Sequence, residues 1–200
     1  MRVIRHFRQA RSSDLTILLL VVSLVLNLLL VAELIGTRSE LEALRTAGFL
    51  EIGTRVPPLD LKSTSASPIR ITYSDVEIPT VLYIMRPSCG WCKTNNPNLK
   101  AMLASAGDAY RLHIISLDEA GVEEYRQAYR IGESILIGVT DDARDIYHMG
   151  GTPQTVVVSP AGIVTHMWMG AYSPAQEREI EDTLGVELPG RLPAASSGGT

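Results

Sequence analysis

Arg86-Pro87-Ser88-Cys89-Gly90-Trp91-Cys92-Lys93 is the stretch that decides how the rest of the chain is interpreted. It contains both cysteines of the 200-residue chain, separated by two residues. An apolar run over 79–85 precedes it, and a helix-compatible stretch over 93–106 follows it. The pattern predicts a buried strand followed by a helix that begins at Cys89. Because N–H groups at a helix start stabilise an anion, we expect the Cys89 thiol to ionise more readily than a free cysteine.

Two thiols at this spacing indicate redox chemistry. Cys92 lies about one helical turn beyond Cys89, close enough for the two to form a disulfide, so we interpret Cys89 as the attacking thiol and Cys92 as the resolving thiol. A zinc site would need about four ligands, and His113, His148 and His166 stand singly, so neither a metal nor a cofactor is expected. A static disulfide is the other alternative, although so short a loop restrains the unfolded chain little.

The N-terminal residues predict a membrane anchor. Residues 1–14 contain four arginines and form a basic arm, whereas 15–32 contains no charged side chain. A helix over 15–35 is long enough to cross about 30 Å of hydrocarbon. The basic arm favours a cytoplasmic N-terminus, which places the remainder outside, in an oxidising compartment. A cleaved signal peptide, which has a shorter apolar core and a small-residue cleavage site, and a buried soluble helix are the alternatives.

The remaining segments predict one modest domain. A short amphipathic stalk or linker helix is expected over 36–52, a globular domain over 53–187 and a disordered tail over 188–200. The formal net charge is −4, which gives no indication of a nucleic-acid partner. The mean hydropathy of +0.12 is raised by the apolar N-terminal span.

Strands and helices alternate through the globular domain. The expected strands are 58–62 and 68–73 as an N-terminal β-hairpin, then 80–85, 110–117, 135–139, 154–158 and 163–169. The expected helices are 93–106, 119–129, 141–147 and 173–184. This order predicts an α/β fold in which helices flank a central mixed sheet.

Four features of the domain form one recognisable pattern. Cys89-Gly90-Trp91-Cys92 stands at a strand-to-helix junction, Pro97 follows five residues after Cys92, Thr152-Pro153 precedes a strand, and a hairpin over 156–169 leads into a final helix. In this order they resemble the thioredoxin superfamily, most closely its membrane-anchored extracytoplasmic thiol–disulfide oxidoreductases of the TlpA/ResA type. The resemblance covers about 53–185 and implies a thioredoxin-like fold.

The resemblance also implies a function and a site. It implies reduction of disulfides in partner proteins, for instance during cytochrome c maturation, by a single-pass protein of the bacterial inner membrane. A membrane or extracytoplasmic electron donor would restore the dithiol. The implied site comprises the catalytic Cys89 and Cys92, the substrate contacts Thr152, Pro153 (after a cis peptide bond) and Trp91, and the thiolate-tuning residues Gly90, Arg86 and Lys93.

The chain departs from this family at the position of the proton acceptor. Tyr83 and Asn95 stand where members often carry an acid, so Asp142, Glu133 or a water could substitute, and the identity of the proton acceptor stays open. A disulfide-forming oxidant and a binding or chaperone-like module without turnover remain as alternative functions. A peroxidase is disfavoured because the Pro-x-x-x-Thr/Ser-x-x-Cys arrangement of peroxiredoxins is missing.

Overall fold

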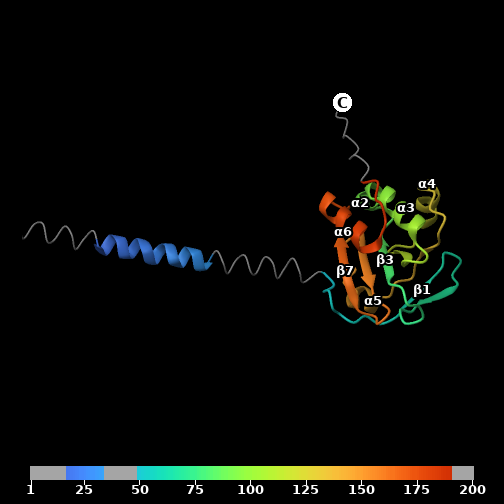
Figure 1. Ribbon diagram of the computed structural model, residues 1–200, viewed down its shortest axis with the longest axis horizontal. Helices are drawn as coiled ribbons and strands as arrows, with labels where there is room; N and C mark the ends of the chain where they lie inside the picture. Colours follow the sequence, from blue (N-terminus) through green and yellow to red (C-terminus); the bar gives the residue numbers. More distant parts are fainter. Residues whose placement is uncertain (1–16, 34–48, 191–200) are drawn as a thin grey trace, which may run out of the picture. The chain divides into compact units, whose positions relative to one another are not determined.

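A computed structural model describes residues 17–33 and 49–190. Residues 17–33 form a helix, and the chain from Leu50 onward forms a separate compact unit (Figure 1). Within 17–33 and 49–190, no helix is both long and apolar enough to cross a bilayer. The expected span over 15–35 and the expected stalk over 36–52 both extend into residues outside these ranges.

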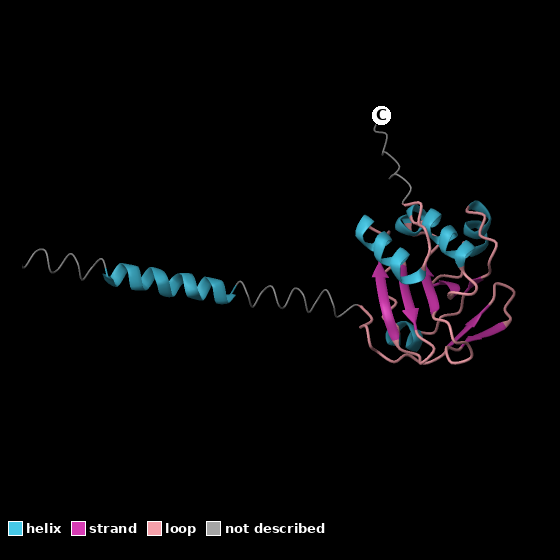
Figure 2. Ribbon diagram, viewed as in Figure 1, coloured by secondary structure: helices cyan, strands magenta, loops and turns pink. Residues whose placement is uncertain are grey.

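Five strands form the main sheet, in the order β5-β4-β3-β6-β7. Figure 2 shows the strands of the domain in magenta and its helices in cyan. They are β3 (Thr80–Met85), β4 (Arg111–Ser116), β5 (Ile135–Leu136), β6 (Gln154–Val158) and β7 (Val164–Met169). The central strand β3 runs parallel to β4 and antiparallel to β6, so the predicted mixed sheet is confirmed. The predicted N-terminal hairpin is the separate antiparallel pair β1 (Leu59–Lys62) and β2 (Pro68–Ile71).

The helix that carries the cysteines is divided in two. The helices of the domain are α2 (Gly90–Thr94), α3 (Asn96–Ser105), α4 (Val122–Ala128), α5 (Asp141–Ile146) and α6 (Pro174–Leu184). The sequence predicts one helix over 93–106 that follows Cys89 and kinks at Pro97, whereas the structure divides it at Asn95 into two helices. Pro97, near the start of α3, has no N–H to continue the ladder of α2. The Asn95 carbonyl instead accepts the first bond of α3, from the N–H of Leu99 at 3.1 Å.

Alternate residues of β3 belong to two different cores. Val81, Tyr83 and Met85 pack in the core that also contains Cys92 and residues of α3, α4 and α6. Leu82 and Ile84 pack on the opposite face, with the segment that enters the domain, the β1–β2 hairpin and the end of α5. Because all six residues of β3 are buried, it forms the middle layer between these two coverings, as a central strand should.

The ends of the domain differ slightly from the expected limits. Leu50, three residues before the expected start, is buried in the second core. At the other end, the backbone N–H groups of Leu188 and Gly190 bond to Glu181 and to Asn98, so these residues of the expected tail are held on the domain. Helix α4 begins three residues later than expected, after Gly121 at a φ of 77°.

Candidate active site

Cys89 occupies the start of α2, as the sequence predicts. Strand β3 ends at Met85, and a tight turn follows in which the Cys89 N–H bonds to the Arg86 carbonyl at 3.1 Å. The Cys89 side chain then caps α2, because its Sγ accepts a hydrogen bond from the Cys92 N–H at 3.1 Å. Cys89 is half-buried, Cys92 is fully buried, and both are free thiols.

Thr152 faces Cys89 from the segment just before β6. The Cys89 Sγ donates to the Thr152 carbonyl oxygen at 3.3 Å, and the Thr152–Pro153 peptide bond is cis. Ile84 of β3 pairs with Gln154 of β6, which brings the residues before β6 beside the end of β3. The Pro153 carbonyl accepts a hydrogen bond from the Gly170 N–H at 2.7 Å. The Thr152 carbonyl is therefore the backbone group of this segment that contacts the Cys89 thiol.

Cys92 lies against a buried set of amides and phenols. Tyr125 donates its hydroxyl to the Cys92 carbonyl at 3.4 Å and accepts from the Asn96 amide at 3.1 Å. Asn95 donates to the Tyr83 hydroxyl at 3.4 Å. All four side chains are neutral groups that are almost completely buried.

Asn95 also joins two further parts of the fold to this set. Its Oδ1 accepts from the Asn98 amide at 3.1 Å and from the Tyr172 N–H at 3.3 Å. Asn98 in turn donates to Glu177 at 3.3 Å, so Glu177 is the carboxylate that this network reaches. Asn95 and Asn98 stand between this carboxylate and Tyr83. Sequence reasoning missed Asn98, Tyr125 and Tyr172, which come from three separate segments.

Burial controls the chemistry of Cys92. It raises the pKa of the Cys92 thiol to about 12, and the hydrogen bond to Cys89 acts in the same direction. Burial also raises the pKa values of Tyr83 and Tyr125 well above that of an exposed tyrosine. The thiol therefore keeps its proton at neutral pH unless the reaction removes it.

The expected substitute acids do not reach the thiols. Asp142 lies on α5, whose end packs against the opposite core, and Glu133 is exposed in the loop before β5. Neither forms a hydrogen bond with Cys92 within the described part of the chain, so the structure assigns no carboxylate to this thiol. Over the same residues, no group of three or more His, Cys, Asp or Glu side chains could hold a metal ion.

The remaining predicted site residues surround Cys89 in different ways. Arg86 is engaged by Asp118, with 2.7 Å between Nη1 and Oδ1. Trp91 is 60% exposed, consistent with the expected contact surface for a partner. Gly90 is exposed and a Cβ there would meet nothing within 4 Å, which leaves its backbone accessible. Lys93 is exposed immediately after Cys92.

Alkylation should report the high pKa of Cys92. In a Cys89→Ser variant, we expect iodoacetamide to label Cys92 at a rate that rises about tenfold per pH unit from about pH 7 to about pH 10. The sign follows because a raised pKa lowers the thiolate fraction at every pH below it, and only the thiolate reacts. A rate that levels off near the ordinary thiol pKa of about 8.5 would contradict this. The same chain unfolded in denaturant is the control.

Comparisons with known proteins agree with this geometry. No family model matches the chain, and no curated protein matches its sequence. Among solved structures, the thioredoxin domain of a thiol-disulfide oxidoreductase from Bacteroides vulgatus is similar, at 15% identity with a TM-score of 0.56 over 68% of this chain and 99% of that one.

Two further solved structures are similar. StoA from Bacillus subtilis matches at 20% identity, with a TM-score of 0.52 over 63% of this chain and 98% of that one. A thiol:disulfide interchange protein of the thioredoxin family from Chlorobium tepidum matches at 16% identity, with a TM-score of 0.53 over 68% and 99%. The compact unit that carries Cys89 and Cys92 therefore has the thioredoxin-like fold.

Proposed function

We propose that the protein is a thiol–disulfide oxidoreductase that reduces disulfides in partner proteins. The observation that carries the proposal is the placement of Cys89. Its half-buried Sγ accepts the Cys92 N–H at 3.1 Å and lies 3.3 Å from the Thr152 carbonyl, with the second thiol one turn behind it. A substrate disulfide that reaches Cys89 thus meets an attacking sulfur and a resolving sulfur in sequence.

The reaction proceeds in two exchanges. The Cys89 thiolate attacks one sulfur of the substrate disulfide, a bond forms between them, and the other substrate sulfur leaves as a thiolate that takes up a proton. The Cys92 thiol then loses its proton and attacks the Cys89 sulfur, which releases the second substrate sulfur as a thiolate that is protonated in turn. The substrate gains two electrons, and the protein is left with a Cys89–Cys92 disulfide.

Substrate positioning is assigned to the backbone of Thr152 and to the exposed surface of Trp91. An extended substrate segment that pairs with the Thr152 main chain would hold its disulfide in line with Cys89. The Trp91 ring offers apolar contact area next to the thiols. One solved structure of the same fold is described as the thioredoxin domain of a thiol-disulfide oxidoreductase and another as a thiol:disulfide interchange protein, which supports the reaction class.

Trapping tests the two-step reaction. With Cys92→Ser, we expect a disulfide-bonded test protein to remain covalently attached to Cys89, because the attached intermediate cannot be resolved. Mass spectrometry under non-reducing conditions should find the adduct, and dithiothreitol should release it. The matched variant Cys89→Ser should form no adduct. If the wild type and Cys92→Ser bind the test protein equally and without covalent attachment, the protein is a binding module without turnover.

The direction of the reaction depends on the reduction potential. We propose that the Cys89–Cys92 couple is reducing, with a potential nearer that of thioredoxin, about −270 mV, than that of DsbA, about −120 mV. Equilibration of the full chain against glutathione and dithiothreitol measures it. A value near −120 mV would make the protein an oxidant and would exclude a reducing role in cytochrome c maturation. A membrane or extracytoplasmic dithiol donor is required to reset a reductant.

We further propose that residues 15–35 anchor the protein in the bacterial inner membrane, with the domain on the periplasmic side. The apolar length and the basic arm support this. Full-length protein should stay with membranes after a carbonate wash, and removal of 1–35 should release it. Removal of 191–200, which lies outside the span, is the control and should change nothing. Full-length protein in the soluble fraction would overturn the anchor.

A further inference from the structure

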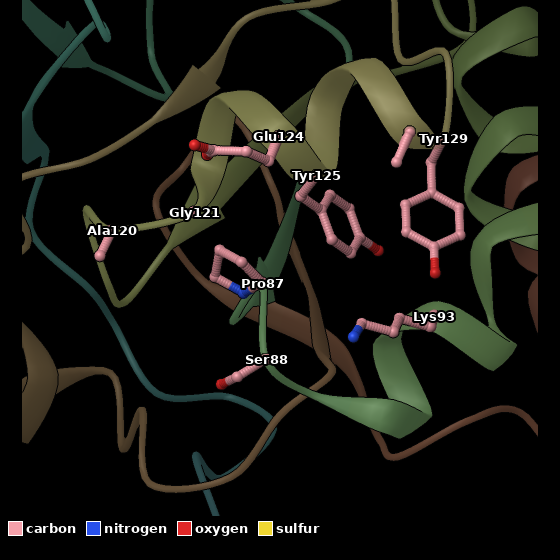
Figure 3. A pocket seen from close by; sticks show the side chains of 9 residues that line it. Pro87, Ser88, Lys93, Ala120, Gly121, Glu124, Tyr125 and Tyr129 are labelled. Atoms are coloured by element: carbon pink, nitrogen blue, oxygen red, sulfur yellow. The ribbon is translucent and has the colours of Figure 1, made fainter.

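A hollow of about 490 Å³ opens beside the cysteines. It lies between the turn that leads into Cys89 and helix α4, and we call it the side pocket. Pro87 and Ser88 form one wall and Lys93 another, while the residues opposite come from Ala120 to Tyr129 (Figure 3). The pocket therefore shares its walls with the thiol site, since Ser88 adjoins Cys89 and Lys93 adjoins Cys92.

The interior of the side pocket is largely apolar. Tyr125 in α4 and Tyr129 directly after this helix present their rings, with ring centroids 4.7 Å apart, and the Pro87 ring lies across from them (Figure 3). Tyr125 is buried and forms the floor, whereas Tyr129 is half-buried at the side. Gly121 approaches Pro87 closely, because a Cβ at Gly121 would lie 3.4 Å from the Pro87 Cβ. Small residues at 88, 120, 121 and 128 leave the space open.

A cation stands at the end of the pocket next to the cysteines. The Lys93 ammonium forms no ion pair or hydrogen bond within 17–33 and 49–190, although the Lys93 backbone N–H bonds to the Cys89 carbonyl. Figure 3 shows this ammonium directed toward the space beside Pro87 and Tyr125. Glu124, on the α4 side, is exposed. A ligand that carries a carboxylate near the cysteines would pair with Lys93.

We infer that the side pocket receives a large apolar or aromatic side chain of the protein substrate, close in sequence to its reactive cysteine and next to an acidic residue that pairs with Lys93. This rests on the proposed function, because the substrate cysteine must lie at Cys89. An extended segment advances about 3.3 Å per residue, and Ser88 and Pro87 lie one and two residues from Cys89. A side chain two or three residues from the substrate cysteine can therefore enter the pocket.

The test uses three synthetic peptides, each joined through its cysteine to a small thiol by a disulfide. The first peptide has Trp two residues after its cysteine and Asp next to that Trp. The second replaces the Trp by Ser and keeps the Asp, and the third keeps the Trp and replaces the Asp by Lys. Single-turnover reduction by the full chain gives a rate constant for each peptide. Hydroxyethyl disulfide, which has no side chain to insert, reports the reactivity of Cys89 alone.

For the wild type we expect the Trp peptide to react about tenfold faster than the Ser peptide, as expected when one large apolar side chain is buried. The same first peptide, with Asp, should react about twofold to fourfold faster than the third, with Lys, a difference in the range of an exposed ion pair. Ala128→Trp, which fills the pocket from an exposed helix position, should remove the Trp preference. Gln127→Trp, on the same helix but outside the pocket, should retain it.

Tyr129→Ala is a second test of the side pocket, for the case in which Ala128→Trp fails to reduce hydroxyethyl disulfide. Tyr129→Ala removes a wall of the pocket and should therefore lower the Trp preference. A wild-type preference below twofold, or a preference that survives both pocket variants, would overturn the inference. If the wild type reduces hydroxyethyl disulfide without discriminating between peptides, only the side pocket is refuted. If it reduces no disulfide at all, the proposed function itself fails.

Discussion

The pairing of β3 with β6 is the constraint on which the site depends. Each strand ends its regular pairing at Ile84 opposite Gln154, and the two chemically important segments extend from that point. Cys89 follows within a few residues of β3, and Thr152 stands two residues before β6, so their contact at 3.3 Å is a consequence of this register. Because side chains alternate along a strand, a slip of one residue would exchange the two faces of β3 and bury the wrong side chains in each core. Register and active-site geometry are therefore specified together.

Burial, and not a neighbouring charge, makes the two thiols of one short motif different. Cys89 caps α2 and receives an N–H from Cys92, whereas the Cys92 side chain enters a core that contains Tyr83 and Tyr125. Amides and phenols can occupy that core because each satisfies part of the hydrogen-bonding capacity of the next. They remain neutral at physiological pH, so they offer Cys92 polar neighbours without stabilising its thiolate. In the proposed reaction, Cys92 would therefore lose its proton only as it attacks the Cys89 sulfur, where the leaving substrate thiolate could take up a proton.

The sequence predicts the succession of strands along the chain, the thiol pair and the Thr152-Pro153 segment. Each has a local signal: apolar runs for the strands, the cysteine spacing for the thiols and a proline for the segment. The sequence predicts one helix kinked at Pro97 where two helices occur, since whether a proline kinks a helix or divides it depends on how the second helix packs. The ion pair of Arg86 with Asp118 has no signal in the sequence. Parallel strands β3 and β4 end at the same edge, which brings these two residues together. The amide and phenol network could not be predicted, because its members are distant in sequence and meet only through packing.

The division of the domain into two cores keeps the segment that enters the domain away from the surface around Cys89. The chain enters the domain at Leu50 and Val56, and both pack in the core on the face of β3 opposite to Cys92. The β1–β2 hairpin and the end of α5 cover the same face, so the entering segment is fixed by contacts that involve neither cysteine. On the other face α3, α4 and α6 enclose Cys92, while Cys89, Gly90 and Trp91 remain at the surface. The segment through which the chain enters the domain is therefore separated by a layer of sheet from the core that contains Cys92.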